Sequence, residues 1–379
     1  MPANQLSQAT PLLDEAVSWL KERLPTSWTV ERANRQNVAG GEPQTLADEA
    51  IEVRAPNGTI LTIAVEARSS FEPRDAERLL TGFGRTLRKF IATVPLLVVA
   101  PWLSPRAQEV LAAEEINYID LTGNALVKLD NPALYLRSTG APRNPQPAPR
   151  GRAQVRGPKA ARLVRLLADV RPPYGVGEIA RSAGLTAGYV SRLLETLDRE
   201  ALVERSRRGR VESVDVSGLL RRWAESYDVL KTNRASSFLA PNGAYDAIGR
   251  LADIAPSGLR VITGSFAAVQ LAPVAAPALL LVYCDDVSTV AEGLRLVPAE
   301  EGANVVLLAP FDRVVWERSS GEGNLFYAAQ SQVAVDCLTG PGRMPAEGEA
   351  VLAWMEEDES RWRLPSLDHL PGAAKSRGR

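Results

Sequence analysis

Arginine side chains are concentrated in one short stretch of the chain, where Arg205, Arg207, Arg208 and Arg210 surround Gly209. A guanidinium group is permanently charged and presents N–H donors in a planar fork that matches two phosphate oxygens. The flanking segments LVERS and RVESV predict two short strands joined by a tight turn. We therefore expect a hairpin whose tip presents arginines to an anion.

The segment before this hairpin, VGEIARSAGLTAGYVSRLLETLDR, predicts two helices separated by a turn. Ile179 and Ala183 face inward on the first helix, which ends at Gly184, and Thr186 is placed to cap the second. Apolar residues recur on the second helix at the spacing of one buried face: Val190, Leu193, Leu194 and Leu197. The opposite face then carries small and polar residues: Gly188, Ser191, Arg192, Glu195, Thr196 and Arg199.

Two helices followed by a hairpin are the pattern of a winged helix-turn-helix, whose second helix enters the major groove of duplex DNA. The hairpin, or wing, would meet the phosphate backbone or the minor groove. Small residues at Ala187 and Gly188 let the helix N-terminus approach phosphate. We expect DNA contacts from the second helix and the wing: Thr186, Gly188, Tyr189, Ser191, Arg192, Arg199, Arg205, Arg207, Arg208 and Arg210. The alternative is a winged helix used for protein contacts alone, with solvated arginines.

A net positive charge is found only in the middle of the chain. The 379 residues carry a net charge of -1, whereas residues 150–234 contain 18 Lys and Arg against 10 Asp and Glu. A basic segment in an otherwise acidic protein favours DNA as the partner over simple solvation.

Composition excludes several classes of function. The one histidine, His369, lies in a proline-flanked tail, so no histidine-dependent hydrolase and no His-rich metal site is expected. Cys284 and Cys337 lie in apolar surroundings far apart in sequence, which predicts buried thiols and no zinc site or disulfide. We expect no metal and no cofactor. No signal peptide and no long apolar run is visible, which predicts a cytoplasmic, nucleoid-associated protein that does not bind membranes.

Linker composition and alternating helix and strand patterns indicate an α/β multidomain protein. We expect an α/β domain over residues 1–140, a linker over 141–157, the winged helix-turn-helix with its exit helix over 158–234, a second α/β domain over 235–365 and a flexible tail over 366–379. The first domain is expected to contain a helix capped by Thr10 and a helix over residues 73–91. The second is expected to contain a strand at RVVWER, residues 313–318.

The first α/β domain resembles the restriction-endonuclease-like, or PD-(D/E)XK, fold. Its order of helix, strand and hairpin places acidic residues at Glu15, Asp48 and Glu66, followed by Arg68. In active members two carboxylates and a lysine hold Mg²⁺ and orient a water for phosphodiester cleavage. Asp48 and Glu66 match the carboxylates, but Arg68 stands where the lysine belongs, and arginine cannot serve as a proton acceptor. The resemblance therefore implies an inactive relative with a vestigial site and no catalytic residue.

The second α/β domain resembles the nucleotidyltransferase-like fold. Thr263-Gly264-Ser265 follows a predicted strand, where active members hold a phosphate, and Asp285 and Asp286 end the next strand. Adjacent carboxylates on a strand point to opposite faces and cannot both hold one metal without a bulge, so a non-catalytic domain is expected.

Three elements together resemble actinobacterial regulators grouped with the AbiEi-family antitoxins of type IV toxin-antitoxin systems. They are DLTGN at residues 120–124, AGYVSR at residues 187–192 and VAVDCLTGPGRMP at residues 333–345. The resemblance implies a transcriptional regulator whose C-terminal domain binds a protein partner or a small ligand. AbiEi antitoxins begin with their winged helix, whereas an α/β domain precedes it here, so a toxin partner is in doubt. DLTGN alone is typical of a tight turn, with ligand or DNA contact as the alternative.

The sequence thus predicts a DNA-binding transcriptional regulator, not an enzyme, that binds double-stranded DNA as a homodimer. Two alternatives stay open. One is a Mg-dependent nuclease of the PD-(D/E)XK type that uses the winged helix to find its substrate. The other is a sensor whose first domain binds single-stranded or damaged DNA without cutting it.

Overall fold

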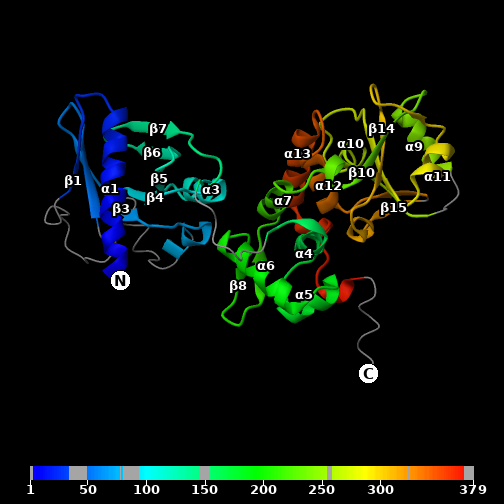
Figure 1. Ribbon diagram of the computed structural model, residues 1–379, viewed down its shortest axis with the longest axis horizontal. Helices are drawn as coiled ribbons and strands as arrows, with labels where there is room; N and C mark the ends of the chain where they lie inside the picture. The colour runs from blue at the N-terminus through cyan, green and yellow to red at the C-terminus, as the bar shows by residue number, and fades with distance from the viewer. Residues whose placement is uncertain are drawn as a thin grey trace. The chain divides into compact units, whose positions relative to one another are not determined.

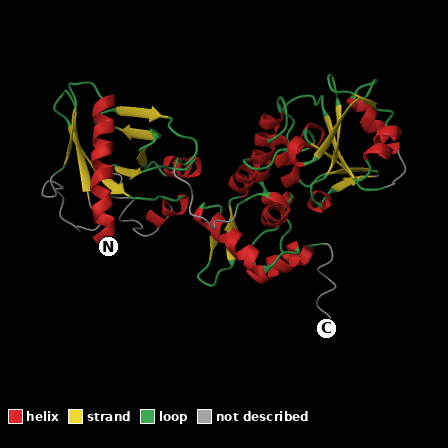
Figure 2. Ribbon diagram, viewed as in Figure 1, coloured by secondary structure: helices red, strands yellow, loops and turns green. Residues whose placement is uncertain are grey.

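The chain divides into two compact units. The computed structural model describes residues 3–33, 49–76, 78–79, 94–145, 154–253, 258–322 and 324–370. The first unit is formed mainly by Met1–Gly151 and the second by Arg152–Asp198 with Leu202–Arg379 (Figure 1). Both mix helices and strands, as the sequence predicts (Figure 2). No helix in these ranges is both long and apolar enough to cross a membrane.

The described part of the first unit contains a mixed seven-stranded sheet in which every strand pairs with its neighbours in sequence. Strands β3, β4 and β5 run parallel, and the other pairs are antiparallel. The strands are β1 (Thr29–Arg32), β2 (Glu49–Arg54), β3 (Ile60–Ala67), β4 (Leu96–Ala100), β5 (Asn117–Asp120), β6 (Ala125–Leu129) and β7 (Leu134–Ser138).

Helices cover both faces of this sheet. Helix α1 (Ala3–Arg23) packs on the face that includes Leu97 and Val99, and α3 (Pro105–Ala113) packs on the face that includes Leu96 and Val98. This alternation is the two-residue period of a strand buried on both sides.

The helix boundaries partly differ from the prediction. Ser104 caps α3 as expected, since its Oγ accepts a hydrogen bond from the Ala107 N–H at 3.1 Å. Helix α1 begins at Ala3, so Thr10 lies inside the helix and the predicted Thr10 cap is wrong. Of the helix predicted over residues 73–91, residues 73–76 and 78–79 are helical, and the remainder lies outside the described residues.

The second unit begins with the winged helix. Its elements are α4 (Gly157–Asp169), α5 (Val176–Ala183), α6 (Ala187–Arg199), β8 (Val203–Arg205), β9 (Val211–Val214) and the exit helices α7 (Val216–Ala224) and α8 (Val229–Thr232). Strands β8 and β9 pair antiparallel as a separate two-stranded sheet.

The rest of the second unit forms around a second mixed sheet, with strand order β13-β10-β14-β12-β11-β16-β15 among the described residues. The strands are β10 (Arg234–Leu239), β11 (Arg260–Thr263), β12 (Leu280–Cys284), β13 (Val297–Pro298), β14 (Val305–Ala309), β15 (Ser320–Glu322) and β16 (Leu325–Tyr327). The helices are α9 (Ala244–Asp253), α10 (Ser265–Ala268), α11 (Val287–Gly293), α12 (Gln330–Leu338) and α13 (Met344–Glu357), with short 3-10 turns η2 (Arg313–Trp316), η3 (Glu359–Arg361) and η4 (Leu367–His369).

The strand predicted at residues 313–318 is wrong. Residues Arg313–Trp316 form the 3-10 turn η2, which Asp312 caps by accepting a hydrogen bond from the Val314 N–H at 2.9 Å. Val314 and Val315 are both buried although they are consecutive. A turn can bury two neighbouring apolar residues against one core, so an apolar pair is ambiguous between strand and turn.

One hydrophobic core runs through the whole second unit. It joins Leu163 and Trp223 of the winged helix to Leu281 and Leu352 around the second sheet. The domain boundary predicted at residue 234 stays a prediction, but the parts on either side of it pack as one compact body.

Candidate nucleic-acid interface

The turn between α5 and α6 has the terminating glycine and the capping residue that are typical of a helix-turn-helix. Gly184 ends α5 with a φ of 63°, in the left-handed region that glycine adopts without a Cβ clash. The Leu185 N–H donates to the Ala180 carbonyl at 2.9 Å, which closes the end of the helix. Thr186 Oγ1 accepts from the Tyr189 N–H at 3.4 Å, so Thr186 caps α6 as predicted.

Helix α6 presents one buried and one exposed face. Its buried face consists of the four apolar residues expected from their spacing, each with no exposed area: Val190, Leu193, Leu194 and Leu197. The exposed positions are Ala187, Gly188, Ser191, Arg192, Glu195 and Arg199. Thr196 was expected on the outer face but is buried, and its Oγ1 donates back to the Arg192 carbonyl at 3.3 Å.

Tyr189 lies at the border of the two faces and is half-buried. Burial raises the pKa of its hydroxyl above 10.0, although the nearby Arg192 works in the opposite direction. The hydroxyl therefore stays protonated at neutral pH and can donate a hydrogen bond to a phosphate oxygen.

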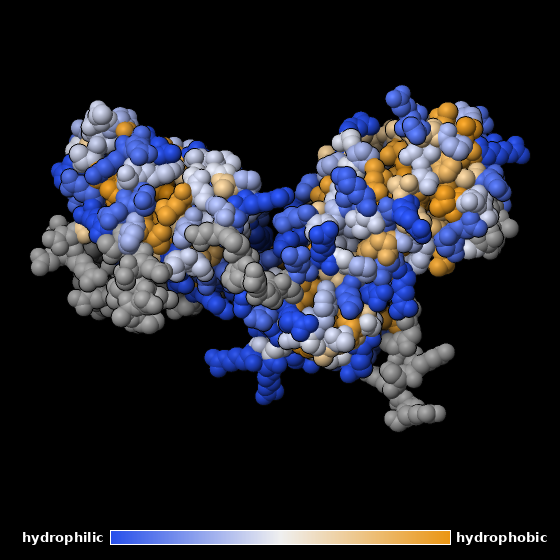
Figure 3. All heavy atoms as spheres, in the orientation of Figure 1, coloured by the Kyte–Doolittle hydropathy of each residue, from blue (hydrophilic) through white to orange (hydrophobic). Residues whose placement is uncertain are grey.

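The wing is a tight hairpin with two exposed arginines at its tip. Gly209 has a φ of 78°, and its N–H donates to the Ser206 carbonyl at 2.8 Å to close the turn. Arg207 and Arg208 are exposed. Among the described residues, neither of them forms a hydrogen bond or an ion pair. Figure 3 shows hydrophilic side chains projecting where the wing lies. These two guanidinium groups are free to meet an external anion.

The other two wing arginines are held by the protein itself. Arg205 Nη2 donates to the Gly209 carbonyl at 3.4 Å, across the turn. Arg210 Nη2 donates to the Pro173 carbonyl at 3.2 Å, and its Nη1 lies 3.7 Å from Glu178 Oε2. Arg205 and Arg210 therefore stiffen and anchor the wing, a difference from Arg207 and Arg208 that the sequence alone did not reveal.

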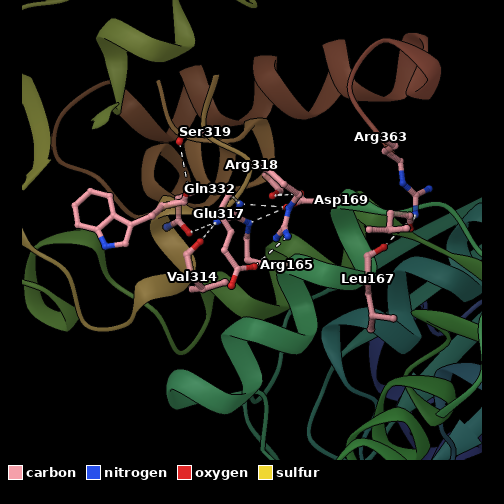
Figure 4. A network of polar contacts seen from close by, with 12 residues as sticks. Arg165, Leu167, Asp169, Val314, Glu317, Arg318, Ser319, Gln332 and Arg363 are labelled. Carbon is pink, nitrogen blue, oxygen red and sulfur yellow. Dashed lines mark hydrogen bonds and ion pairs between the residues drawn. The ribbon is translucent and has the colours of Figure 1, made fainter. Parts of the chain in front are cut away.

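Helix α4 anchors the winged helix to the remainder of the second unit through a buried charge network (Figure 4). Arg165 is fully buried, and its Nη2 lies 3.1 Å from Asp169 Oδ2. Arg165 Nη1 also donates to Gln332 Oε1 at 2.9 Å, and Arg318 and Ser331 both donate to the Asp169 carboxylate. Burial alone would raise the pKa of Asp169, but Arg165 and Arg318 hold it below its ordinary value. The carboxylate is thus an anion between two guanidinium groups.

Two further ion pairs support the same connection. Arg162 contacts the Asp312 carboxylate through Nε at 3.0 Å and Nη2 at 2.7 Å. Arg221 on α7 contacts Glu349 on α13 in the same forked geometry, with the closest pair at 2.7 Å. Side chains from both α4 and α7 therefore tie the winged helix to η2 and α13, which lie beside the second sheet in sequence and fold.

The residues predicted as a vestigial nuclease site do not come together as one group. Glu15 is exposed on α1, whereas Glu66 pairs in register with Val98 and shares its sheet face, opposite to the face that α1 covers. Arg68 Nε donates to Glu66 Oε1 at 2.6 Å and occupies that carboxylate. Asp48 lies outside the described residues. Within the described ranges no cluster of His, Cys, Asp and Glu suits a metal ion.

The phosphate-binding turn expected near Gly264 contains a buried carboxylate instead. Ser265 Oγ donates to Glu347 Oε2 at 2.5 Å, and both residues are buried. Asp286 caps α11 through the Thr289 N–H at 3.0 Å, and Asp285 accepts from the Leu259 N–H at 3.1 Å. These carboxylates have structural partners, and a negative charge beside Ser265 would repel a phosphate.

The DLTGN element forms a self-contained turn. The Asp120 carboxylate accepts hydrogen bonds from the N–H groups of Thr122 at 2.9 Å, Asn124 at 3.0 Å and Leu103 at 3.0 Å. Gly123 has a φ of 100°. Asp120 has no exposed area, which agrees with the turn interpretation.

Fold and surface define this chain as a winged helix-turn-helix protein with flanking α/β parts. Residues 159–207 match the IclR helix-turn-helix domain, a range that contains α4 from its third residue, α5, α6, β8 and the start of the wing turn. The chain has no match among the curated proteins or the solved structures. The match supports a DNA-binding transcription regulator. The AbiEi grouping, the restriction-endonuclease-like fold and the nucleotidyltransferase-like fold stay predictions.

Proposed function

We propose that this protein is a sequence-specific transcriptional regulator that binds duplex DNA as a homodimer in the cytoplasm, at the nucleoid. Helix α6 enters the major groove, where Ser191 and Arg192 contact base edges or phosphates. Arg207 and Arg208 contact the backbone or the minor groove beside it. The remaining predicted contacts, from Thr186, Gly188, Tyr189 and Arg199, position α6 on the phosphates.

The observation that carries this proposal is the pairing of two features. One is the exposed face of α6, inside the segment that matches the IclR helix-turn-helix domain, and the other is the two unengaged wing arginines, Arg207 at the end of that segment and Arg208 directly after it. The outer face of α6 and the wing tip are both exposed within the second unit. The surrounding segment is the basic part of an acidic chain, which favours DNA as the partner.

Replacing Arg192 tests base readout. Arg192→Ala is expected to weaken binding to a preferred duplex by about 1–3 kcal/mol, or roughly 5- to 150-fold, since a side chain that reads a base edge discriminates by this amount. Binding to duplex of unrelated sequence should change little. Fluorescence anisotropy with the full chain measures both, and Arg250→Ala on α9 is the control. An equal loss on both duplexes would make Arg192 a phosphate contact and remove it from sequence readout.

We further propose that the flanking α/β parts are not catalytic. Glu66 is engaged by Arg68, and Arg68 replaces the lysine that phosphodiester cleavage would use. The full chain and its Glu66→Ala variant should both leave plasmid and single-stranded DNA intact in Mg²⁺ or Mn²⁺. Cutting by the wild type that is lost in Glu66→Ala would establish the nuclease alternative. Competition by single-stranded DNA for the full chain, unaffected by Arg207→Ala/Arg208→Ala, would support the sensor alternative.

A further inference from the structure

Strand β7 forms an open edge of the sheet in the first unit. Within the described residues it pairs with β6 on one side and with no strand on the other (Figure 1). An unpaired edge presents a row of backbone N–H and C=O groups that a further strand can bind. The sequence of β7 is LYLRS, which contains no proline, no glycine and no carboxylate. This edge is therefore a candidate interaction surface.

The other edges of the two seven-stranded sheets are poorly suited to strand pairing. Strand β1 has the sequence TVER and exposes Glu31 and Arg32. In the second sheet, β13 has two residues, one of them Pro298, and β15 has three residues centred on Gly321. Exposed charges, short length, proline and glycine all weaken an edge as a pairing site. Among the described strands, β7 is the edge that best fits an additional strand.

The hydrogen bonds of β6 show which β7 residues turn their backbone to the open edge. The Lys128 N–H donates to Asn117 Oδ1 on β5 at 2.7 Å, so the backbone of Lys128 faces β5. Backbone groups alternate in direction along a strand, so the residue before Lys128 faces β7, where its partner is Leu136. Leu136 is thus bonded to β6. Its two neighbours, Tyr135 and Arg137, therefore turn their backbone N–H and C=O groups to the open edge.

The two faces of β7 carry different side chains. Leu134 and Leu136 are partly buried against the core that includes α1. Tyr135 and Arg137 point to the opposite face, where Tyr135 is 62% exposed and Arg137 is exposed as well. Neither of these two side chains forms a hydrogen bond or an ion pair within the described ranges. The edge thus offers an aromatic ring and a guanidinium group two positions apart.

We propose that β7 pairs antiparallel with β7 of a second copy of this chain, centred on Leu136. Tyr135 of each copy then lies opposite Arg137 of the other copy, and each of these pairs can exchange both of its backbone hydrogen bonds. A guanidinium group is attracted to an aromatic ring, so the facing side chains are complementary. Leu136 meets Leu136 of the second copy, which extends the apolar face across the junction.

The side chains favour this register over the neighbouring ones. A pairing centred on Arg137 would place two guanidinium groups directly opposite each other, which is destabilising. A pairing centred on Tyr135 would overlap only residues 134–136. The pairing centred on Leu136 overlaps the whole strand. Lys128 lies opposite Tyr135 on β6, so the tyrosine ring separates the two cations of that row. The partner that β7 fits best is therefore a second copy of itself.

This interface specifies the homodimer of the proposed function, and its biological role rests on that function. The pairing itself uses residues of the first unit alone, so it can be tested on the full chain without DNA.

The first test is disulfide capture of the full chain. The two Leu136 positions would form a non-hydrogen-bonded pair with Cα atoms about 4.5 Å apart, which a disulfide can span. Leu136→Cys should therefore give a covalent dimer with glutathione disulfide as the oxidant. Leu134→Cys is the matched control, because its two positions would lie about 14 Å apart and should not be captured. The native thiols of Cys284 and Cys337 are buried and should not contribute. No dimer from Leu136→Cys, or equal capture of both variants, would overturn the pairing.

The second test is sedimentation velocity over a series of protein concentrations. Tyr135→Pro removes the N–H that faces the open edge and leaves the hydrogen bonds between β6 and β7 in place. Tyr135→Val is the matched control, because it loses the ring and keeps the N–H. The dimer dissociation constant of Tyr135→Pro should exceed that of Tyr135→Val at least about tenfold, since each copy loses a hydrogen bond. Equal constants, or a wild type that stays monomeric, would overturn the interface.

Together these measurements separate the interface from the proposed function. Capture of Leu136→Cys in a protein that selects no DNA sequence would overturn the proposed function and leave the interface in place. A wild type that selects paired half-sites on DNA, with no capture of Leu136→Cys, would leave the function in place and overturn the interface.

Discussion

Removal of the two arginines at the wing tip is expected to weaken DNA binding on every sequence. Arg207→Ala/Arg208→Ala should lower the affinity for duplex DNA about 10- to 100-fold, because each guanidinium that meets a phosphate contributes a charge-assisted hydrogen bond. The slope of log K against log salt should flatten by roughly 0.9 for each phosphate that the variant no longer neutralises, or about 1.8 for two phosphates. Anisotropy titrations over a series of salt concentrations give both quantities.

The control for the wing tip is Arg250→Ala/Arg313→Ala, which removes the same charge elsewhere in the second unit. If wing and control variants shift the slope equally, net charge alone governs binding and the wing has no special role. An unchanged slope in the wing variant would contradict a wing contact.

Arg210→Ala should act differently from the wing-tip variant, because Arg210 contacts Glu178 and Pro173 and its loss loosens the wing.

Neutralising Asp169 is expected to have the largest effect on stability. Asp169→Asn keeps the size of the side chain but leaves Arg165, with no exposed side-chain area, and Arg318, with 11%, without their shared counter-charge. Breaking a buried ion pair from one side typically costs about 3–5 kcal/mol. Hydrogen exchange of the α4 and α12 amides measures this loss in the second unit separately from the first.

The matched control for Asp169 is Glu349→Gln, which breaks an ion pair between the same two parts of the second unit. The Arg221–Glu349 pair is about half exposed on both sides, so its loss should cost at most about 1 kcal/mol. Equal costs for the two variants would contradict the importance of burial.

The lowered pKa of Asp169 also predicts that the second unit is sensitive to acid. Its stabilising contribution is present above its ordinary value of 3.8 and is lost as the pH falls through the lower, folded-state pKa.

Local patterns predicted the winged helix well. Four apolar residues at helical spacing identified the buried face of α6, and Gly184 and Thr186 identified the turn, because both signals are set within a few residues. The wing followed from alternating polarity around Gly209. The prediction put Thr196 on the wrong face of α6. Helical spacing gives only the direction of a residue from the helix axis, and it does not show that a short side chain bonds back to its own backbone.

Contacts between distant residues could not be predicted in the same way. Arg210 and Pro173 are separated by a long stretch of sequence, so nothing local showed that Arg210 is held by the protein while Arg207 and Arg208 stay exposed. The same holds for Asp169 with Arg318, and for Glu66, whose side of the sheet depends on the register with β4.

Selection of bound duplexes from a random DNA library tests the central claim most directly. The full chain should enrich one recurring sequence, arranged as two related half-sites about one helical turn apart if a homodimer binds. The Arg192→Ala variant should lose the preference at one base pair of each half-site while it still retains DNA. A folded wild-type protein that enriches no sequence above the starting library would contradict the account.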